Sequence, residues 1–128
     1  MTTNSKHTIL LVDDDPLINR MYQIKLSEDG YNVQIAANGE EALIKAKKHK
    51  PDLILLDLMM PKMNGIEALK ELKKDETTKN IKIIILTNLE DKDGNLEKAK
   101  EMGALDYLVK SETDLKVLSE KVRSALAN

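Results

Sequence analysis

Three consecutive carboxylates stand directly after an apolar run in the segment LVDDDP, residues 11–16. Two carboxylates about 4 Å apart repel each other by roughly 4 kcal/mol at an effective dielectric constant of 20, so such a cluster calls for a cation. Mg2+ keeps several waters and binds one or two carboxylates, which suits an open site. Asp13 and Asp14 are therefore candidate metal ligands, whereas Asp15, before Pro16, is predicted to be the N-cap of a helix.

A further carboxylate, Asp57, lies within LILLDLMMP and is the only charge from Leu53 to Met60. A carboxylate in such apolar surroundings needs a partner to remain ionised. Two other polar groups, the Thr87 hydroxyl and the Lys110 ammonium, each come at the end of an apolar run. A hydroxyl and an ammonium that face several carboxylates indicate a phosphate site with a divalent ion.

These groups can act together only if the elements that carry them end at one place. Five short runs rich in Ile, Leu and Val have the length of strands: 9–12, 33–37, 53–56, 81–86 and 107–109. Segments with helical spacing alternate with them, and Gly30 and Gly103 are predicted to follow helix ends. The apolar residues that indicate these helices include Leu17, Met21 and Ile24, then Ile66, Leu69 and Leu72, and last Leu115, Leu118 and Val122.

Continuous apolar runs indicate strands that are buried on both faces, and right-handed crossovers join such strands into a parallel sheet. The sequence therefore predicts an α/β fold, a (βα)5 doubly wound domain with helices on both faces of the sheet. In such sheets functional groups lie beyond the carboxyl ends of the strands. Asp13, Asp57, Thr87 and Lys110 are all expected at that edge.

Length and composition narrow the class of protein. The 128 residues fit a single domain, 1–128, in which 1–7 is polar and expected to be disordered. Twenty Lys and Arg balance 22 Asp and Glu, which speaks against direct nucleic-acid binding. Cysteine is absent, and no apolar stretch reaches the length of a membrane span, so a cytoplasmic protein is expected.

Four segments, ILLVDDDP, LILLDLMMPKMNG, IIILTN and GALDYLVKS, occur in this order and spacing. Together they resemble the receiver domain of two-component response regulators, from about Ile9 to Leu126. The resemblance implies a flavodoxin-like sheet with the strand order 2-1-3-4-5. It also implies a phosphoacceptor signalling domain rather than an enzyme, one that catalyses only its own phosphorylation and slow dephosphorylation.

The resemblance also assigns the phosphorylation site. Asp57 matches the phosphoacceptor, which takes a phosphoryl group from the phosphohistidine of a sensor histidine kinase or a histidine phosphotransfer protein. Asp13 and Asp14 match the acidic pair that holds Mg2+, together with Asp57 and the backbone carbonyl of Met59. Lys110 matches the ammonium that pairs with the phosphoryl group.

Two further residues match the conformational switch. Thr87 corresponds to the hydroxyl that moves to bond the phosphoryl group, and Tyr107 to the aromatic residue that turns inward when the threonine moves. Pro61 and Gly65 match the loop after the phosphoacceptor strand. The resemblance thus implies a conformational change between the fourth and fifth helices, which controls a protein partner or an effector domain.

Three departures from the commonest receiver pattern matter. Ser111 follows Lys110 where many receivers have proline, so the frequent cis peptide is not expected to be favoured here. Asn88 stands where a small residue is usual. Met59 and Leu89, two residues beyond the phosphoacceptor and the switch threonine, are apolar and cannot orient an attacking water, which predicts a long-lived phosphoryl group.

Two other classes of protein share parts of this pattern. A phosphatase of the haloacid dehalogenase type needs a second Asp where this chain has Met59. A flavodoxin-like cofactor binder needs a Ser, Thr or Gly-rich loop after the first strand, where DDDP would repel a phosphate. No DNA-binding or catalytic segment follows the last predicted helix, so we expect a stand-alone receiver or a receiver fragment of a hybrid kinase or transcription regulator. Dimer formation on phosphorylation stays open.

Overall fold

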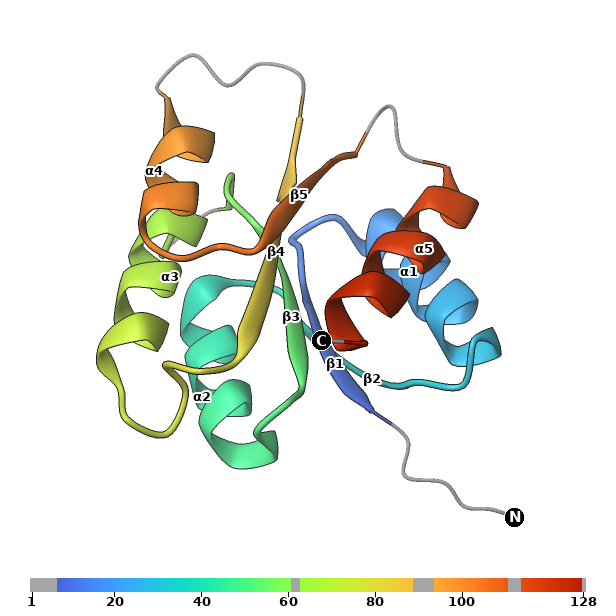
Figure 1. The fold of residues 1–128 in the computed structure, drawn as a ribbon, viewed down its shortest axis with the longest axis horizontal. Helices are drawn as coiled ribbons and strands as arrows, with labels where there is room; N and C mark the ends of the chain where they lie inside the picture. The colour runs from blue at the N-terminus through green and yellow to red at the C-terminus, as the bar shows by residue number, and fades with distance from the viewer. Residues whose placement is uncertain (1–6, 61–62, 89–93, 111–113, 128) are drawn as a thin grey trace.

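A five-stranded parallel sheet in the order β2-β1-β3-β4-β5 forms the centre of the molecule, as the computed structural model shows (Figure 1). The structure describes residues 7–60, 63–88, 94–110 and 114–127. The predicted fold class and strand order are confirmed, and strand ends differ from the predicted ones by one residue at most. The strands are β1 Thr8–Val12, β2 Asn32–Ala36, β3 Leu53–Asp57, β4 Lys82–Thr87 and β5 Asp106–Val109.

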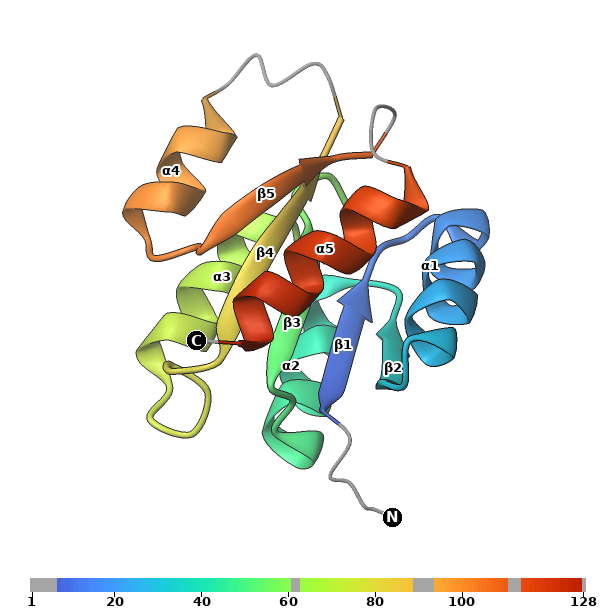
Figure 2. The ribbon, with the colours of Figure 1, turned by 45° about the vertical axis from the view of Figure 1, so that its right-hand side comes forward.

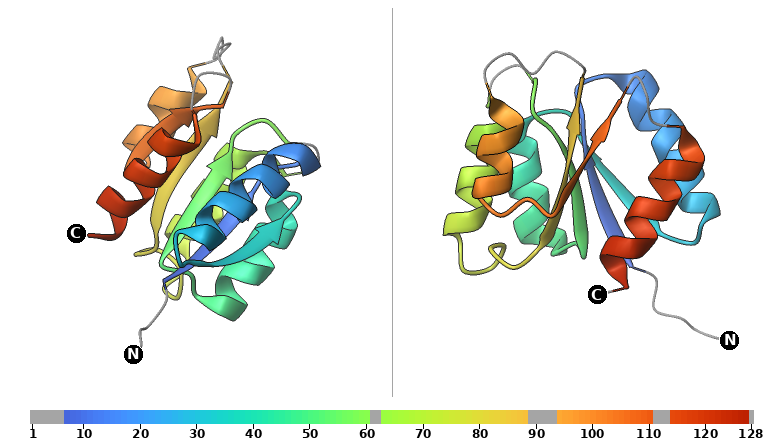
Figure 3. Two further views of the ribbon diagram at one scale, coloured as in Figure 1. Left: turned by 90° about the vertical axis from the view of Figure 1, so that its right-hand side faces the viewer. Right: turned by 45° about the horizontal axis from the view of Figure 1, so that its top comes forward.

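Helices cover both faces of this sheet. On one face lie α1 and α5, and on the other lie α2, α3 and α4, as Figures 2 and 3 show. No helix in the described ranges is both long enough and apolar enough to cross a membrane. The helices are α1 Pro16–Glu28, α2 Gly39–His49, α3 Gly65–Lys74, α4 Asn95–Glu101 and α5 Leu115–Leu126.

The alternation of side chains along the strands divides the core into two clusters. Leu10 and Ile54 pack beneath α2, α3 and α4, whereas Ile9 and Leu55 pack against α1 and α5. All four side chains are buried. Because both faces of the sheet are covered, both sets of positions must be apolar, which is why these strands read as continuous apolar runs.

Local signals place the start and end of α1. The Asp15 side chain accepts a hydrogen bond from the backbone N–H of Leu17 at 2.9 Å, and Pro16 occupies the first helical position, so the predicted N-cap is confirmed. Gly30 follows the helix with a φ of 99°, a conformation that favours glycine. The loop before α1 therefore holds its three carboxylates in a defined conformation.

The buried face of α1 differs from the one its apolar pattern indicates. The helix is confirmed, but Leu17, Met21 and Ile24 are exposed to solvent. Asn19 and Tyr22 are buried instead. The reason is that Asn19 lies against the end of β1, where it bonds the backbone of the first carboxylate residue. The inner face of α1 is thus partly polar because it contacts the backbone at the end of β1.

Candidate functional site: an acidic pocket at the carboxyl edge of the sheet

Three carboxylates meet where β1 and β3 end. Asp13 directly follows β1 and Asp57 is the last residue of β3, and these strands are neighbours in the sheet. One carboxylate oxygen from each of Asp13, Asp14 and Asp57 lies within 4.8 Å of the others. Lys110, just beyond β5, places its Nζ 3.1 Å from Asp13 Oδ2 and 3.4 Å from Asp57 Oδ2. Residues 97 positions apart thus share one pocket.

Three hydrogen bonds hold Asp13 in place. Its N–H donates to the carbonyl of Ala36 at the end of β2, and its carbonyl accepts from Asn19 Nδ2 at 2.8 Å. Its Oδ1 accepts from the N–H of Asp15 at 2.9 Å. The Asp13 side chain is fully buried, whereas Asp14 is exposed. Asp13 therefore provides a fixed, buried carboxylate in the pocket and Asp14 a solvent-facing one.

The carboxylate of Asp57 is buried, with only 1% of the residue exposed. Burial raises its pKa from the usual 3.8 to about 7, and the nearby charge of Asp13 acts in the same direction. The N–H of Met59, which donates to Asp57 Oδ1 at 3.1 Å, and the ammonium of Lys110 oppose this rise in the pKa. The pocket contains more negative charge than its own lysine neutralises.

Lys110 is fixed by its backbone and by its charge. Its N–H donates to the carbonyl of Thr87 at 2.7 Å, which ties the end of β5 to the end of β4. Desolvation acts to lower the pKa of Lys110, but the charges and hydrogen bonds of Asp57 and Asp13 outweigh it and raise the pKa. The lysine therefore stays charged and directs one ammonium at two carboxylates.

The donor set fits a hard divalent cation. Three carboxylates gather in the pocket and one ammonium contacts two of them, and the raised pKa of Asp57 indicates that the lysine compensates the negative charge only in part. Oxygen ligands on one side and an open, solvent-facing side match the preference of Mg2+, which binds few carboxylates and keeps waters. Met59, whose N–H donates to Asp57 Oδ1, is 56% exposed. The acidic pocket is thus compatible with Mg2+ binding.

A close backbone approach explains Gly65, the first residue of α3. A Cβ atom at this position would lie 2.3 Å from the carbonyl oxygen of Asp57 and 2.5 Å from the Cα of Leu58. The Gly65 N–H donates to the carbonyl of Leu58 at 3.1 Å. Any side chain here would push the start of α3 away from the end of β3, so glycine keeps the loop beside Asp57.

Two of the residues assigned by resemblance, Thr87 and Tyr107, have their described side-chain contacts with groups other than the three carboxylates. The hydroxyl of Thr87 donates to the carbonyl of Asn88 at 3.0 Å. The ring of Tyr107 is half-buried on β5 and lies near Lys100 and Lys121. The structure therefore brings the acidic residues and Lys110 together, and within the described residues the contacts of the Thr87 hydroxyl and the Tyr107 ring are with other groups.

Sequence reasoning missed Asn19 and Tyr22 on the inner face of α1. The Tyr22 hydroxyl and the Asn19 Oδ1 are buried and have no hydrogen-bond partner within the described ranges. Burial raises the pKa of Tyr22, the charge of Asp13 raises it further, and Lys110 partly offsets both. The available signal was the spacing of Asn19, Tyr22 and Leu26, three and four residues apart, on the face opposite the exposed apolar residues.

Four predicted features lie outside the described residues. They are Pro61 in the loop after β3, Leu89, Ser111 with the peptide bond that precedes it, and the N-terminal segment up to residue 6.

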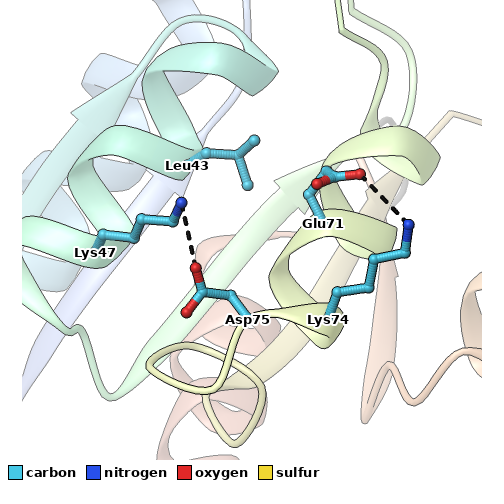
Figure 4. Close-up of a pocket in the computed structure, with 5 residues that line it drawn as sticks. All are labelled: Leu43, Lys47, Glu71, Lys74 and Asp75. Carbon is cyan, nitrogen blue, oxygen red and sulfur yellow. Dashed lines mark ion pairs between the residues drawn. The ribbon is translucent and has the colours of Figure 1, made fainter.

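A second polar cleft lies between α2 and α3 (Figure 4). Lys47 and Asp75 form an ion pair of 3.2 Å across it, and Lys74 pairs with Glu71 along α3 at 3.9 Å. Asp75 accepts hydrogen bonds from the hydroxyl and the N–H of Thr77, which, with Lys47, lower its pKa to about 2. Each charge here has an opposite partner, so this cleft lacks the uncompensated charge of the acidic pocket.

The fold and the pocket together define a flavodoxin-like domain with an acidic, metal-compatible site at the carboxyl edge of its sheet. Residues 9–123 match the family model described as the response regulator receiver domain. The chain therefore belongs to this family of two-component signalling domains, and the resemblance seen in its motifs is confirmed.

Curated relatives support this assignment. The chain is 44% identical over 104 residues to the alkaline phosphatase synthesis transcriptional regulatory protein PhoP of Bacillus subtilis, which covers 80% of this chain and 41% of that protein. It is 38% identical over 118 residues to the DNA-binding dual master transcriptional regulator RpaA of Synechocystis, with coverage of 92% and 48%. The chain thus spans less than half the length of these two relatives.

Solved structures agree with the fold. The chemotaxis protein CheY4 of Vibrio cholerae superposes with a TM-score of 0.87 and 33% identity, covering 95% of this chain and 100% of that one. A CheY-like receiver domain protein of Methanospirillum hungatei gives a TM-score of 0.86 and 31% identity, with coverage of 96% and 95%. The chain shares its architecture with receivers from different organisms.

Proposed function

We propose that this domain accepts a phosphoryl group on Asp57 from the phosphohistidine of a sensor histidine kinase or histidine phosphotransfer protein, with Mg2+ as cofactor. The observation that carries this proposal is the pocket itself. The buried Asp57 carboxylate lies within 4.8 Å of Asp13 and Asp14 and 3.4 Å from the Lys110 ammonium. Such a set offers a nucleophile, oxygen ligands and a positive charge at one point.

The chemistry needs little more than these groups. A carboxylate oxygen of Asp57 attacks the phosphorus, the P–N bond breaks, its electron pair returns to the imidazole, and an acyl phosphate forms. Phosphoryl transfer depends chiefly on positioning and on stabilisation of the charge on the transferred oxygens. Lys110 supplies one such charge. The Met59 N–H orients the attacking carboxylate of Asp57 by holding its Oδ1. Bound Mg2+, held by Asp13, Asp14, Asp57 and the backbone carbonyl of Met59, supplies further positive charge.

The new phosphoryl group carries roughly two negative charges and three acceptor oxygens. We propose that Thr87 then exchanges its hydrogen bond to the Asn88 carbonyl for one to the phosphoryl group. The space that this movement opens lets Tyr107 turn inward, and the region from α4 to α5 changes its surface. A protein partner or an effector domain binds the changed surface. A second copy of the domain can be that partner, which would give a phosphorylation-dependent homodimer.

The test is intact mass after incubation with acetyl phosphate, with and without Mg2+, for the wild type and for Asp57→Asn. One added phosphoryl group on the wild type alone, and only with Mg2+, is the expected result. An adduct of equal yield on the Asp57→Asn variant would place the phosphoryl group elsewhere, and no adduct under any condition would remove the proposal.

The phosphoryl group is expected to be long-lived, because Met59, two residues beyond Asp57, has a thioether that does not orient an attacking water. Loss of the added mass over time measures this. We expect the Met59→Asn variant, whose side chain both donates and accepts, to lose the group several-fold faster. Equal rates for the two proteins would contradict the role of this position.

The output of the full-length protein is a separate proposal. PhoP and RpaA are named transcriptional regulators, and this chain spans 41% and 48% of their lengths. We infer that the domain works in the cytoplasm, either alone or as the receiver of a transcription regulator or hybrid kinase. In the regulator case a separate effector domain, not this one, contacts DNA. Phosphorylated and unphosphorylated protein compared by light scattering would test for the homodimer.

A further inference from the structure

The ring of Tyr107 lies between two lysines that come from different helices. Lys100 Nζ on α4 is 5.0 Å from the ring centroid, and Lys121 Nζ on α5 is 5.1 Å from it. These helices cover opposite faces of the sheet, and β5, which carries the tyrosine, is its edge strand between them (Figure 2). An ammonium within about 6 Å of a ring centroid is attracted to the face of the ring. One aromatic side chain thus links α4 to α5.

The two lysines differ in their other contacts. Lys121 Nζ also donates to the backbone carbonyl of Tyr107 at 2.8 Å and to Asp106 Oδ1 at 3.1 Å, so it fixes the strand as well as the ring. Lys100 has an exposed side chain whose other contact is an ion pair of 3.8 Å with Glu97, one turn earlier on α4. Lys100 therefore offers the cleaner means of changing the hold on the ring without changing β5.

We propose that Lys100 and Lys121 are positioning residues that hold the Tyr107 ring in its half-buried position, so that release of the ring requires both contacts to be given up. This inference rests on the proposed role of Tyr107 as the switch residue. The Thr87 hydroxyl donates to the Asn88 carbonyl at 3.0 Å, the bond that it gives up in the proposed switch. The lysines thereby set how readily phosphorylation moves α4 and α5.

The size of the effect follows from the strength of the contact. A cation–π contact at an exposed site favours one arrangement by about two- to fivefold. Removing the charge of Lys100 should shift the equilibrium toward the switched state by this factor. A ligand that binds the switched state better than the unswitched state should then bind the variant more tightly than the wild type, by about the same factor.

The variant Lys100→Met keeps a long, unbranched side chain and removes its charge. Its matched control is Lys74→Met, because Lys74 pairs with Glu71 at the same three-residue spacing and at 3.9 Å, on α3 rather than on α4. One measurement is the ring NMR signal of Tyr107 in the unphosphorylated protein without metal, assigned with Tyr107→Phe. The other is the affinity for beryllium fluoride, a phosphoryl stand-in, with Mg2+.

We expect Lys100→Met to move the Tyr107 signal and to tighten beryllium fluoride binding about two- to fivefold, with neither change in Lys74→Met. Lys100→Arg should restore both values. A Lys100→Met protein that matches Lys74→Met in both measurements overturns the proposal, as does failure of the arginine to restore them. If the wild type binds no beryllium fluoride, the phosphoacceptor role fails, while the ring signal of the unphosphorylated protein still decides the role of Lys100.

Discussion

Asp57 and Asp75 each face a lysine, yet their pKa values are shifted in opposite directions. Burial, followed by the charge of Asp13, raises the pKa of Asp57 to about 7. Hydrogen bonds from Thr77, followed by the contact with Lys47, lower the pKa of Asp75 to about 2. The lysine distances, 3.4 Å and 3.2 Å, are nearly equal, so the contact with lysine does not explain the difference.

The surroundings of the two carboxylates explain it. Asp75 caps the C-terminus of α3 at the surface, where water and the Thr77 donors solvate its charge. Asp57 is enclosed in the pocket with a second buried carboxylate, Asp13. A buried charge that is only partly compensated destabilises the metal-free fold. The first arrangement serves stability, and the second sets up a site that a cation completes.

Replacing Asp57 with Asn gives the largest expected effect. The variant should take no phosphoryl group. Without Mg2+ at pH 8 its free energy of unfolding should exceed that of the wild type by about 1–3 kcal/mol, because each unit of a raised carboxyl pKa corresponds to about 1.4 kcal/mol. Urea unfolding followed by circular dichroism measures the difference.

The matched control is Asp75→Asn, which removes a charge that is well solvated and hydrogen-bonded. Its melting temperature should fall by less than about 4 °C at pH 8, because a solvent-exposed ion pair contributes little to stability. If both variants were stabilised, or both destabilised, the contrast between the two aspartates would be wrong.

The pH dependence of stability gives a second test of the same pocket. Between the usual pKa of 3.8 and the raised value of about 7, the folded protein keeps a proton on Asp57 that the unfolded chain has released. Its contribution to stability is therefore fully present below about pH 4 and is lost as the pH rises to about 7, by an amount on the order of a few kcal/mol. Asp57→Asn should lack this slope.

Mg2+ binding should restore the stability that the protein loses as the pH rises to about 7. A ligand that binds only the folded state at one hundred times its Kd raises stability by about 2.7 kcal/mol. The gain from a fixed Mg2+ concentration should be larger at pH 8 than at pH 5, since protons compete with the metal for Asp57. An equal gain at both values, or an equal gain in Asp57→Asn, would mean that the metal binds elsewhere.

The buried hydroxyl of Tyr22 offers a third test near the pocket. It has no hydrogen-bond partner among the described residues, and an unsatisfied buried polar group costs about 1–3 kcal/mol. Tyr22→Phe should therefore raise the free energy of unfolding, by about 1 kcal/mol. Tyr31→Phe, at a partly exposed ring, is the control and should change little. A destabilised Tyr22→Phe protein would show that the hydroxyl is bonded in solution.

Much of the architecture could be predicted from the sequence because its signals are local. The apolar runs gave the strands to within one residue, and Asp57 was visible as the one charge in an apolar segment that ends a strand. Asp15 before Pro16 marked the start of α1. The strand order came from the resemblance, since patterns of residues along the chain show where strands lie but not which strands are neighbours.

The rest depends on contacts that a linear pattern does not contain. The inner face of α1 was hidden because its apolar residues, such as Met21, face solvent, while Asn19 and Tyr22 face inward to the pocket. The hydrogen bond of Thr87 to its neighbour's carbonyl is a matter of side-chain rotation. The same is true of Lys100 beside Tyr107, because the lysine has four rotatable bonds and shows no sequence signal for an aromatic contact.

The smallest expected effect concerns the cleft between α2 and α3 (Figure 4). Lys47→Met should lower the melting temperature by about 1–3 °C near neutral pH, because an exposed ion pair contributes little. Lys74→Met, whose pair with Glu71 is longer and more exposed, should lower it less.

The pH dependence of this effect identifies its cause. Since the folded-state pKa of Asp75 is about 2, the loss of melting temperature in Lys47→Met should persist down to pH 4 and disappear as the pH falls toward 2. High salt should shrink it at every pH by screening. A loss that persists unchanged as the pH falls to 2 would mean that Lys47 stabilises α2 through its helix C-terminus instead of through Asp75.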